Sequence, residues 1–275
     1  MPTIDEKRVY ADKTGKAELF VAAALGVVVV DVSDDRIGGF GIDHRCTALD
    51  VASAAGHIAV ATDERVLLDR GEGEGFENAG FGSAVAVGFD GDDLLAADES
   101  GRVARRAIDA ADTDENSDAW TTLGEVDHPR AIDGSLVAAA DGVHRVDGDA
   151  LSHVGLDDAR DVSASGVPLA ATGSGLYALG NGWMDVLSGS FRVVASDGRR
   201  AHAVGDGRVY ARTDDDEWET LDVPVDEPLV GVVHGPATYA VTEAGTLLMD
   251  AGDGWRSQTL GLDGIAGVGV RFIEE

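Results

Sequence analysis

Alternating apolar and polar positions recur along the chain in seven short stretches, each interrupted by a turn. A period of two on both sides of a turn predicts an antiparallel β-hairpin. The seven hairpins are LFVAAALGVVVV (19–30), IAVATDERVLL (58–68), LLAADESGRVAR (94–105), LVAAADGVHRV (136–146), PLAATGSGLYAL (168–179), AHAVGDGRVYA (201–211) and ATYAVTEAGTLLM (237–249). No segment shows a helical period, so the pattern indicates an all-β chain.

A third run follows each hairpin, and an aromatic residue usually opens it. The positions in this column are Ile37, Phe76, Trp120, Leu151, Trp183, Trp218 and Trp255. All four tryptophans of the chain fall here. Large rings fill a gap that widens away from an axis, so we expect the tryptophans to pack between repeats. Sugar stacking is the alternative role, and burial distinguishes the two.

A fourth run, of small and β-branched residues, begins about ten residues after the position that opens each third run. These runs are 46–53, 83–89, 130–134, 160–165, 192–196, 229–235 and 265–272. Small residues suit the strand closest to a crowded axis. Seven units of four strands predict a seven-bladed β-propeller with four-stranded antiparallel blades.

The two ends of the chain predict how the ring closes. The first unit has its outer strands from residue 18 onward but no inner strand before them, and the chain ends with an inner run, 265–272. We expect that run to complete the first blade, which seals exposed strand edges. In the alternative register, KRVYAD (7–12) is the inner strand. The expected organisation is an N-terminal extension, 1–17, and one propeller domain, 18–275.

The whole chain resembles a family of haloarchaeal β-propellers. Units such as GRVYARTDDDEWETL (207–221) also look like the Asp-box hairpins of sialidase-type and photosystem-assembly propellers, in which an S-x-D-x-G-x-T-W turn precedes a strand. Only the Trp218 end matches, because Ala211, Thr213, Asp215 and Glu217 replace the expected Ser, Asp, Gly and Thr. The resemblance implies an architecture and no sialidase activity.

The charge of the chain is extreme, with 51 acidic and 21 basic residues and a formal net charge of −30. Only Lys7, Lys13 and Lys16 are lysines. This composition resembles that of proteins from salt-loving archaea. Self-repulsion at this charge is screened in brine, where the Debye length falls to about 3 Å at 1 M salt. The alternative is an acidic protein from an organism of ordinary salinity.

The same charge argues against two classes of partner. Nucleic acid and anionic membrane surfaces are both disfavoured, because no run of basic residues offsets the acidic surplus. One cysteine, Cys46, excludes an internal disulfide. The first residues lack an apolar signal core, and the longest apolar run, 20–30, is too short to span a membrane. We therefore expect a cytoplasmic protein.

Two acidic segments are candidate metal sites. Asp214, Asp215 and Asp216 form the tip of a predicted hairpin, where successive turn residues rarely converge on one cation. In the insertion 109–120, Asp112, Asp114 and Asn116 match the first half of a calcium loop, but Ser117 and Leu123 replace its glycine and its bidentate glutamate. We expect solvated turns, no metal and no cofactor.

The strongest candidate site is a ring of arginines. Inner strands of a propeller all begin at one mouth of its channel, and the loops between second and third strands reach the same face. The arginines at these positions are Arg45, Arg130, Arg160, Arg192, Arg65, Arg102 and Arg208. They could bind a carboxylate, a phosphate or an acidic loop bidentately. Alternatively, they pair with acids of neighbouring blades, such as Asp43, Asp127, Asp157, Asp158 and Asp161.

The sequence leaves two functional hypotheses. The first is a non-enzymatic binding or scaffold protein that presents one loop face to a protein partner or a small anionic ligand. The second is a hydrolase or lyase at the arginine-lined mouth, with His44 or His128 as acid–base; Cys46 beside His44 is a weaker nucleophile candidate. An enzyme should show a deep pocket where arginine and histidine converge without neutralising acids.

Overall fold

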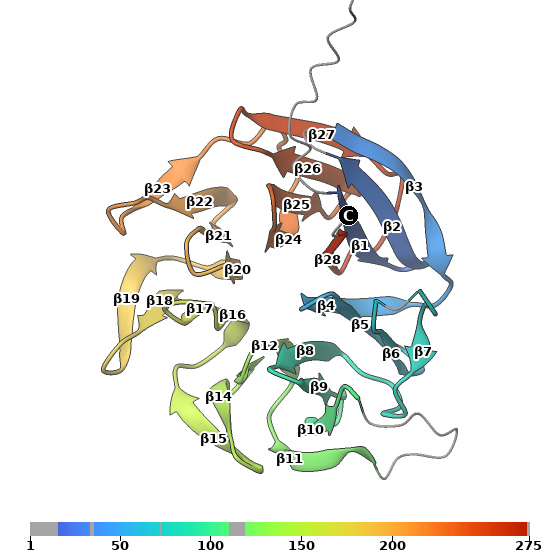
Figure 1. Ribbon diagram of the computed structural model, residues 1–275. Helices are drawn as coiled ribbons and strands as arrows, with labels where there is room; N and C mark the ends of the chain where they lie inside the picture. The colour runs from blue at the N-terminus through green and yellow to red at the C-terminus, as the bar shows by residue number, and fades with distance from the viewer. Residues whose placement is uncertain (1–15, 34–35, 72, 110–118, 274–275) are drawn as a thin grey trace, which may run out of the picture.

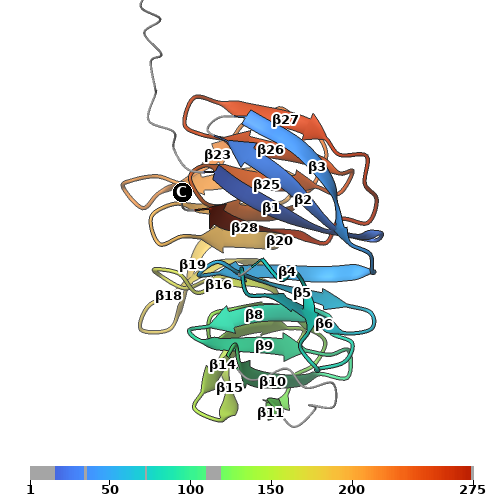
Figure 2. The same ribbon diagram turned by 45° about the vertical axis from the view of Figure 1, so that its right-hand side comes forward.

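Seven antiparallel sheets stand around a central axis in the computed structural model (Figure 1), which describes residues 16–33, 36–71, 73–109 and 119–273. Every sheet has four strands, as predicted from the repeats. Figure 2, turned by 45°, shows the strands running between the two faces of the ring, and within each blade they are arranged from the axis outward. The predicted seven-bladed, all-β architecture is confirmed.

The blades are numbered in chain order, and their strands are given from the axis outward. Blade 1 comprises β28 (Gly267–Ile273), β1 (Lys16–Ala23), β2 (Gly26–Ser33) and β3 (Arg36–His44), and blade 2 comprises β4 (Ala48–Ala54), β5 (His57–Thr62), β6 (Val66–Asp69) and β7 (Glu77–Asn78). Blade 3 comprises β8 (Ala86–Asp90), β9 (Asp93–Ala97), β10 (Arg102–Ala107) and β11 (Thr121–Glu125), and blade 4 comprises β12 (Pro129–Asp133), β13 (Leu136–Ala139), β14 (Gly142–Asp147) and β15 (Ala150–Gly155).

Blade 5 comprises β16 (Ala159–Ser163), β17 (Leu169–Thr172), β18 (Gly175–Leu179) and β19 (Trp183–Ser188). Blade 6 comprises β20 (Phe191–Ser196), β21 (Ala201–Gly205), β22 (Arg208–Arg212) and β23 (Trp218–Leu221). Blade 7 comprises β24 (Leu229–His234), β25 (Thr238–Thr242), β26 (Thr246–Asp250) and β27 (Trp255–Thr259). We call the face on which the inner strands begin the top face and the opposite one the bottom face. No helix among the described residues is long and apolar enough to cross a membrane.

The ring closes between the two ends of the chain. Strand β28 pairs antiparallel with β1, from Ala22↔Gly267 to Lys16↔Ile273, and so supplies the inner strand of blade 1. The predicted closure by 265–272 is therefore confirmed. The alternative inner strand, 7–12, lies outside the described residues.

Arg271 joins this closing strand to the next blade. Its guanidinium bonds Glu18 of β1 at 2.8 Å and Asp69 of β6 at 2.7 Å, and it lies over the Phe20 ring at 4.7 Å. Asp69 is buried. Because the three charged residues come from β28, β1 and blade 2, one arginine ties the C-terminal strand to both of its neighbours.

Apolar side chains from adjacent blades form the core. The tryptophans lie in these contacts: Trp120 donates its indole N–H to the Ala79 carbonyl of the preceding blade at 2.8 Å, and Trp183 donates to Val154 at 3.0 Å. Trp218 and Trp255 pack against clusters that include residues of the blade before them. The predicted packing role of the tryptophan column is therefore what the structure shows.

Inner strands lie close together at the axis, which explains their small residues. A Cβ added at Gly88 of β8 would come within 2.6 Å of Ile132 of β12. No side chain larger than hydrogen fits there without a shift of the neighbouring strand.

Five inner strands carry a β-bulge at their second residue, at the top face. The bulged residues are Leu49, Arg130, Arg160, Arg192 and Val230. A bulge places an extra residue outside the regular ladder and re-aims its side chain. Three of the predicted arginines owe their direction to this irregularity.

Candidate functional site at the mouth of the central channel

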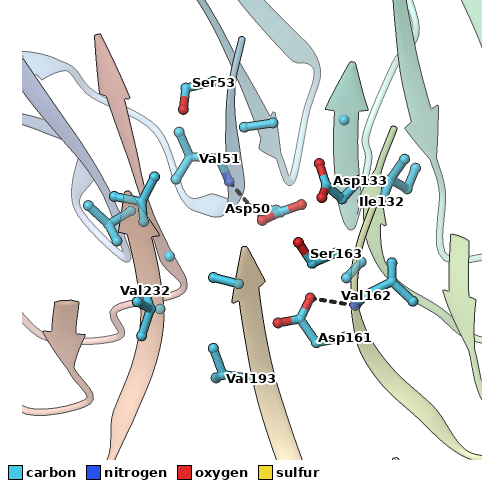
Figure 3. A pocket seen from close by; sticks show the side chains of 18 of the residues that line it. Asp50, Val51, Ser53, Ile132, Asp133, Asp161, Val162, Ser163, Val193 and Val232 are labelled. Carbon is cyan, nitrogen blue, oxygen red and sulfur yellow. Dashed lines mark hydrogen bonds between the residues drawn. The ribbon is translucent and has the colours of Figure 1, made fainter. Parts of the chain in front are cut away.

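A cavity of about 1030 Å³ runs along the axis, and the inner strands of all seven blades line it. Arg130, Arg160 and Arg192 line it near the top face, and His234 and Phe272 belong to the strand ends at the bottom face. Figure 3 shows the interior, where Asp50, Asp133 and Asp161 project into the cavity from β4, β12 and β16.

The three bulged arginines reach across to the following blade in the same way. Arg130 donates to the carbonyl of Ala159 at 3.0 Å and to Asp158 at 2.6 Å. Arg160 donates to the carbonyl of Phe191 at 3.5 Å and to the Ser190 hydroxyl at 2.8 Å. The guanidinium groups of Arg130 and Arg160 therefore each bond the first residue of the next inner strand and the residue before it.

Arg192 follows this pattern only in part, since it donates to the carbonyl of Leu229 and no acidic partner within ion-pair distance appears among the described residues. Asp158 accepts from both Arg130 and Arg160, and these guanidinium groups hold the pKa of its carboxyl below the usual range. Structural pairing therefore accounts for Arg130 and Arg160, whereas Arg192 bonds only a backbone carbonyl.

The other four predicted arginines also lie at the top face, in different environments. Arg65 pairs with Glu64 at 2.8 Å. Arg102 pairs with Asp98 at 3.0 Å and lies over the Phe81 ring at 4.1 Å. Arg45 and Arg208 are exposed and have no carboxylate within ion-pair distance in the described part of the chain.

The two candidate histidines do not form an acid–base centre with the bulged arginines. His128 contacts its neighbour Asp127 and is 78% exposed in its side chain. His44 packs edge-on against Phe76, with ring centroids 6.0 Å apart. His44 lines a smaller pocket of about 370 Å³ together with Arg45 and Cys46.

Acidic residues line that pocket as well. Desolvation by burial, together with the negative charges of Asp63 and Glu64, raises the pKa of the Cys46 thiol. A raised pKa lowers the thiolate population that a nucleophile needs. Because Asp63 and Glu64 line it, this pocket does not bring arginine and histidine together without neutralising acids, as the enzyme hypothesis requires.

The structure describes one of the two acidic segments that were candidate metal sites. Asp214, Asp215 and Asp216 occupy the turn between β22 and β23, where the backbone N–H of Asp216 donates to Thr213 at 3.1 Å. Asp112, Asp114 and Asn116 lie outside the described residues. Among residues that are described, no group of three or more His, Cys, Asp or Glu side chains is placed to hold a metal ion.

Among the aspartates inside the channel, only Asp161 was named from the sequence, as a partner for an arginine, whereas Asp50 and Asp133 were not identified. Asp50 accepts the N–H of Val51 at 2.8 Å and that of Val87, in the next blade, at 2.9 Å. Asp161 repeats this arrangement with Val162 at 2.9 Å and Val194 at 2.8 Å. The signal was present in the sequence as an Asp–Val pair at the same register of two inner runs, LDVAS and RDVSAS.

These carboxylates tie blade to blade but are costly to ionise. Desolvation inside the channel raises the pKa of Asp50 to about 6 and that of Asp161 to about 8, although two backbone N–H groups oppose the shift in each case. The charges of Asp133 and Asp50 add to the increase at Asp161. At neutral pH the channel therefore carries fewer negative charges than its composition implies.

A histidine pair joins blades 6 and 7 at the bottom face. His202 Nδ1 and His234 Nε2 are 2.8 Å apart and their rings stack with centroids 5.0 Å apart. Burial lowers the pKa of His202 to about 4 and that of His234 to about 3. Both rings are therefore neutral at pH 7, with one nitrogen donating to the other.

The fold and this channel define a seven-bladed β-propeller with an arginine-bearing mouth. The chain belongs to the HVO_0234-like β-propeller family, whose model matches residues 3–271. This match confirms the resemblance to a haloarchaeal β-propeller family. No curated protein matches the chain.

Solved structures show the same fold at low sequence identity. "YCF48 bound to D1 peptide" matches with a TM-score of 0.59 and 16% identity, covering 84% of this chain and 94% of that chain. AztD from Citrobacter koseri matches with a TM-score of 0.57 and 13% identity, covering 91% and 83%. The WD40 β-propeller domain of Doa1 matches with a TM-score of 0.62 and 14% identity, covering 84% and 94%.

Proposed function

We propose that the chain is a non-enzymatic binding or scaffold protein of a high-salt cytoplasm, and that its top face binds a protein partner or a small anionic ligand. One observation carries the proposal: seven arginines of a chain with net charge −30 lie at the top face, around one mouth of the channel. Arg45 and Arg208 are exposed there without an acidic partner among the described residues. Uncompensated guanidinium groups are suited to bidentate recognition of carboxylates.

Two further observations support binding over catalysis. The candidate histidines of the top face contact Asp127 or pack on Phe76, and Asp63 and Glu64 line the pocket that holds His44. One structural relative is a propeller bound to a peptide. At this identity that relative supports a shared fold, and its ligand serves here only as a precedent for peptide binding by such a ring.

Affinity capture tests the proposal. Tagged protein is recovered from its own cells, lysed and washed in multimolar KCl, and compared with a variant that carries Arg45→Glu and Arg208→Glu. Arg199→Glu is the matched control, since Arg199 is an exposed arginine on the bottom face. We expect a stoichiometric partner that the double variant loses and the control keeps. Equal recovery by both variants, or no partner at all, would contradict the protein-partner proposal.

A further inference from the structure

A second cavity, of about 600 Å³, lies between blades 6 and 7 beside the channel mouth. We call it the blade 6–7 pocket. Arg160, Arg192 and Arg208 line it together with Pro228 and the connection that precedes β24. It is thus formed around the one bulged arginine that lacks an acceptor side chain in the next blade.

Arg192 differs from Arg130 and Arg160 because the residue that precedes the next inner strand is a proline. Asp158, Ser190 and Pro228 each precede an inner strand, and each accepts a backbone N–H from its own blade, from Gly173, Asp206 and Glu243 respectively. In the first two cases, the side chain accepts a guanidinium N–H from the preceding blade. Proline has no acceptor side chain. Arg192 therefore keeps only its bond to the Leu229 carbonyl.

The chain also leaves more room at this junction. Residues 222–228 connect β23 to β24, whereas only 189–190 connect β19 to β20 and 156–158 connect β15 to β16. Val223 and Val225 of the longer connection line the pocket and pack in one apolar cluster with Val204 and Val209 of blade 6. The result is a pocket with an apolar wall and two guanidinium groups, Arg192 and Arg208, that have no carboxylate partner among the described residues.

The charges around the pocket restrict the anion it can hold. Asp206, Asp222, Asp226 and Glu227 line it as well as the three arginines. Asp206 already accepts the N–H of Ser190 at 3.2 Å. Four acids around three arginines disfavour a dianion such as phosphate more strongly than a monoanion placed on the guanidinium groups.

We propose that the blade 6–7 pocket binds a monoanionic carboxylate attached to an apolar group. Arg192 and Arg208 hold the carboxylate, and the valine wall covers the apolar part. This inference rests on the proposed function, since it names the ligand chemistry of one part of the top face. The same chemistry occurs in a free acyl amino acid and in the C-terminal residue of a peptide.

Ligand-observed NMR titration in multimolar KCl tests the chemistry. The probes are N-acetyl-leucine and its neutral analogue N-acetyl-leucinamide, and a hexapeptide that ends in Val-Leu with either a free carboxylate or an amide. We expect both carboxylates to bind at least about tenfold more tightly than their amides, since charge-assisted bonds are the stronger ones. Similar affinity of acid and amide, or no binding of either acid, overturns the inference.

Three variants assign the site. Arg208→Gln should weaken carboxylate binding by about tenfold, whereas the bottom-face control Arg199→Gln should leave it unchanged. Pro228→Ser keeps every arginine but restores the acceptor that Ser190 provides for Arg160. We expect this substitution to weaken binding severalfold with the thermal unfolding midpoint preserved. Unchanged affinity in both Arg208→Gln and Pro228→Ser contradicts the assignment.

The experiments distinguish a peptide C-terminus from a small-molecule carboxylate, and they also distinguish the pocket inference from the proposed function. A peptide acid that binds much more tightly than N-acetyl-leucine identifies a peptide C-terminus, whereas equal affinities identify a small molecule. A captured partner, together with probe acids that bind no more tightly than their amides, overturns the pocket inference and leaves the proposed function standing. Arginine-dependent probe binding without any captured partner supports the pocket inference and contradicts only the protein-partner form of the proposed function.

Discussion

Polar side chains at the inner strands mostly connect one blade to the next. The bulged Arg130 and Arg160 bond the top of the following blade, and Asp50 and Asp161 bond its backbone from inside the channel. Each of these bonds satisfies a backbone group that faces the channel. At this scale, an arginine or aspartate is a candidate for ligand binding only where the next blade supplies no partner.

The histidine pair predicts a loss of stability in mild acid. His202 is 8% exposed and its folded pKa is about 4, below the unfolded value near 6.5. Below pH 6.5 the unfolded chain binds more protons, so the contribution of His202 to stability decreases as the pH falls towards 4. At pH 5 this contribution is about 1 to 2 kcal/mol smaller than at pH 7.5.

The variant His202→Gln cannot titrate and should lose that part of the pH dependence. Denaturant unfolding at pH 7.5 and pH 5 measures it in both proteins. Asp161, whose raised pKa makes stability fall as the pH rises through about 8, is present in both and cancels in the comparison. Parallel pH profiles of wild type and variant would contradict the neutral, stacked pair.

At the scale of elements, the strands were predictable because short apolar or alternating runs are bounded by turn residues, although middle strands such as β6, β13 and β17 are buried on both faces. The inner run 229–235 corresponds to β24, and the aromatic positions Trp183, Trp218 and Trp255 open the outer strands β19, β23 and β27. Bulges were not predictable, because the shift at Arg130 or Arg192 appears only once the strand pairs with its neighbour. A residue that turns out of the ladder leaves the same alternating pattern in the sequence.

Ring closure depends on Arg271, and its removal should be costly. Arg271→Ala leaves the buried Asp69 and the largely buried Glu18 without their cation, which we expect to lower the free energy of unfolding by about 2 to 4 kcal/mol. Denaturant titration measures the change. Arg65→Ala is the matched control, because its exposed pair with Glu64 should contribute about 0 to 1 kcal/mol. Equal effects of the two substitutions would show that the closing ion pairs contribute little.

At the scale of the whole molecule, the net charge of −30 predicts a strong dependence on salt. The unfolding midpoint should rise between about 0.1 M and 3 M KCl, since screening shortens the range of repulsion among the acidic residues. Sucrose at matched osmolality is the control that separates screening from solvent exclusion. A midpoint that stays flat in KCl would remove the argument for a high-salt environment.

The candidate site was predictable only in part. The sequence places Arg130, Arg160 and Arg192 at the start of inner strands, since the repeat alone determines which end of a blade they occupy. Their pairing was not predictable, because Asp158 lies 28 residues beyond Arg130 and meets it only through the ring. The unpaired state of Arg192 depends likewise on Pro228, whose position is informative only after the blades are superposed in register.

Site-specific photo-crosslinking in the native cell tests the top-face proposal most directly. A crosslinking residue replaces either Leu49, exposed at the bulge of β4 on the top face, or Val167, exposed between β16 and β17 on the bottom face. Both are apolar and similarly exposed, at 39% and 46%, so the two variants differ chiefly in the face they probe. We predict one discrete adduct from position 49 and none from position 167. Adducts of equal yield from both faces, or an adduct from position 167 alone, would contradict the assignment of the top face as the binding surface.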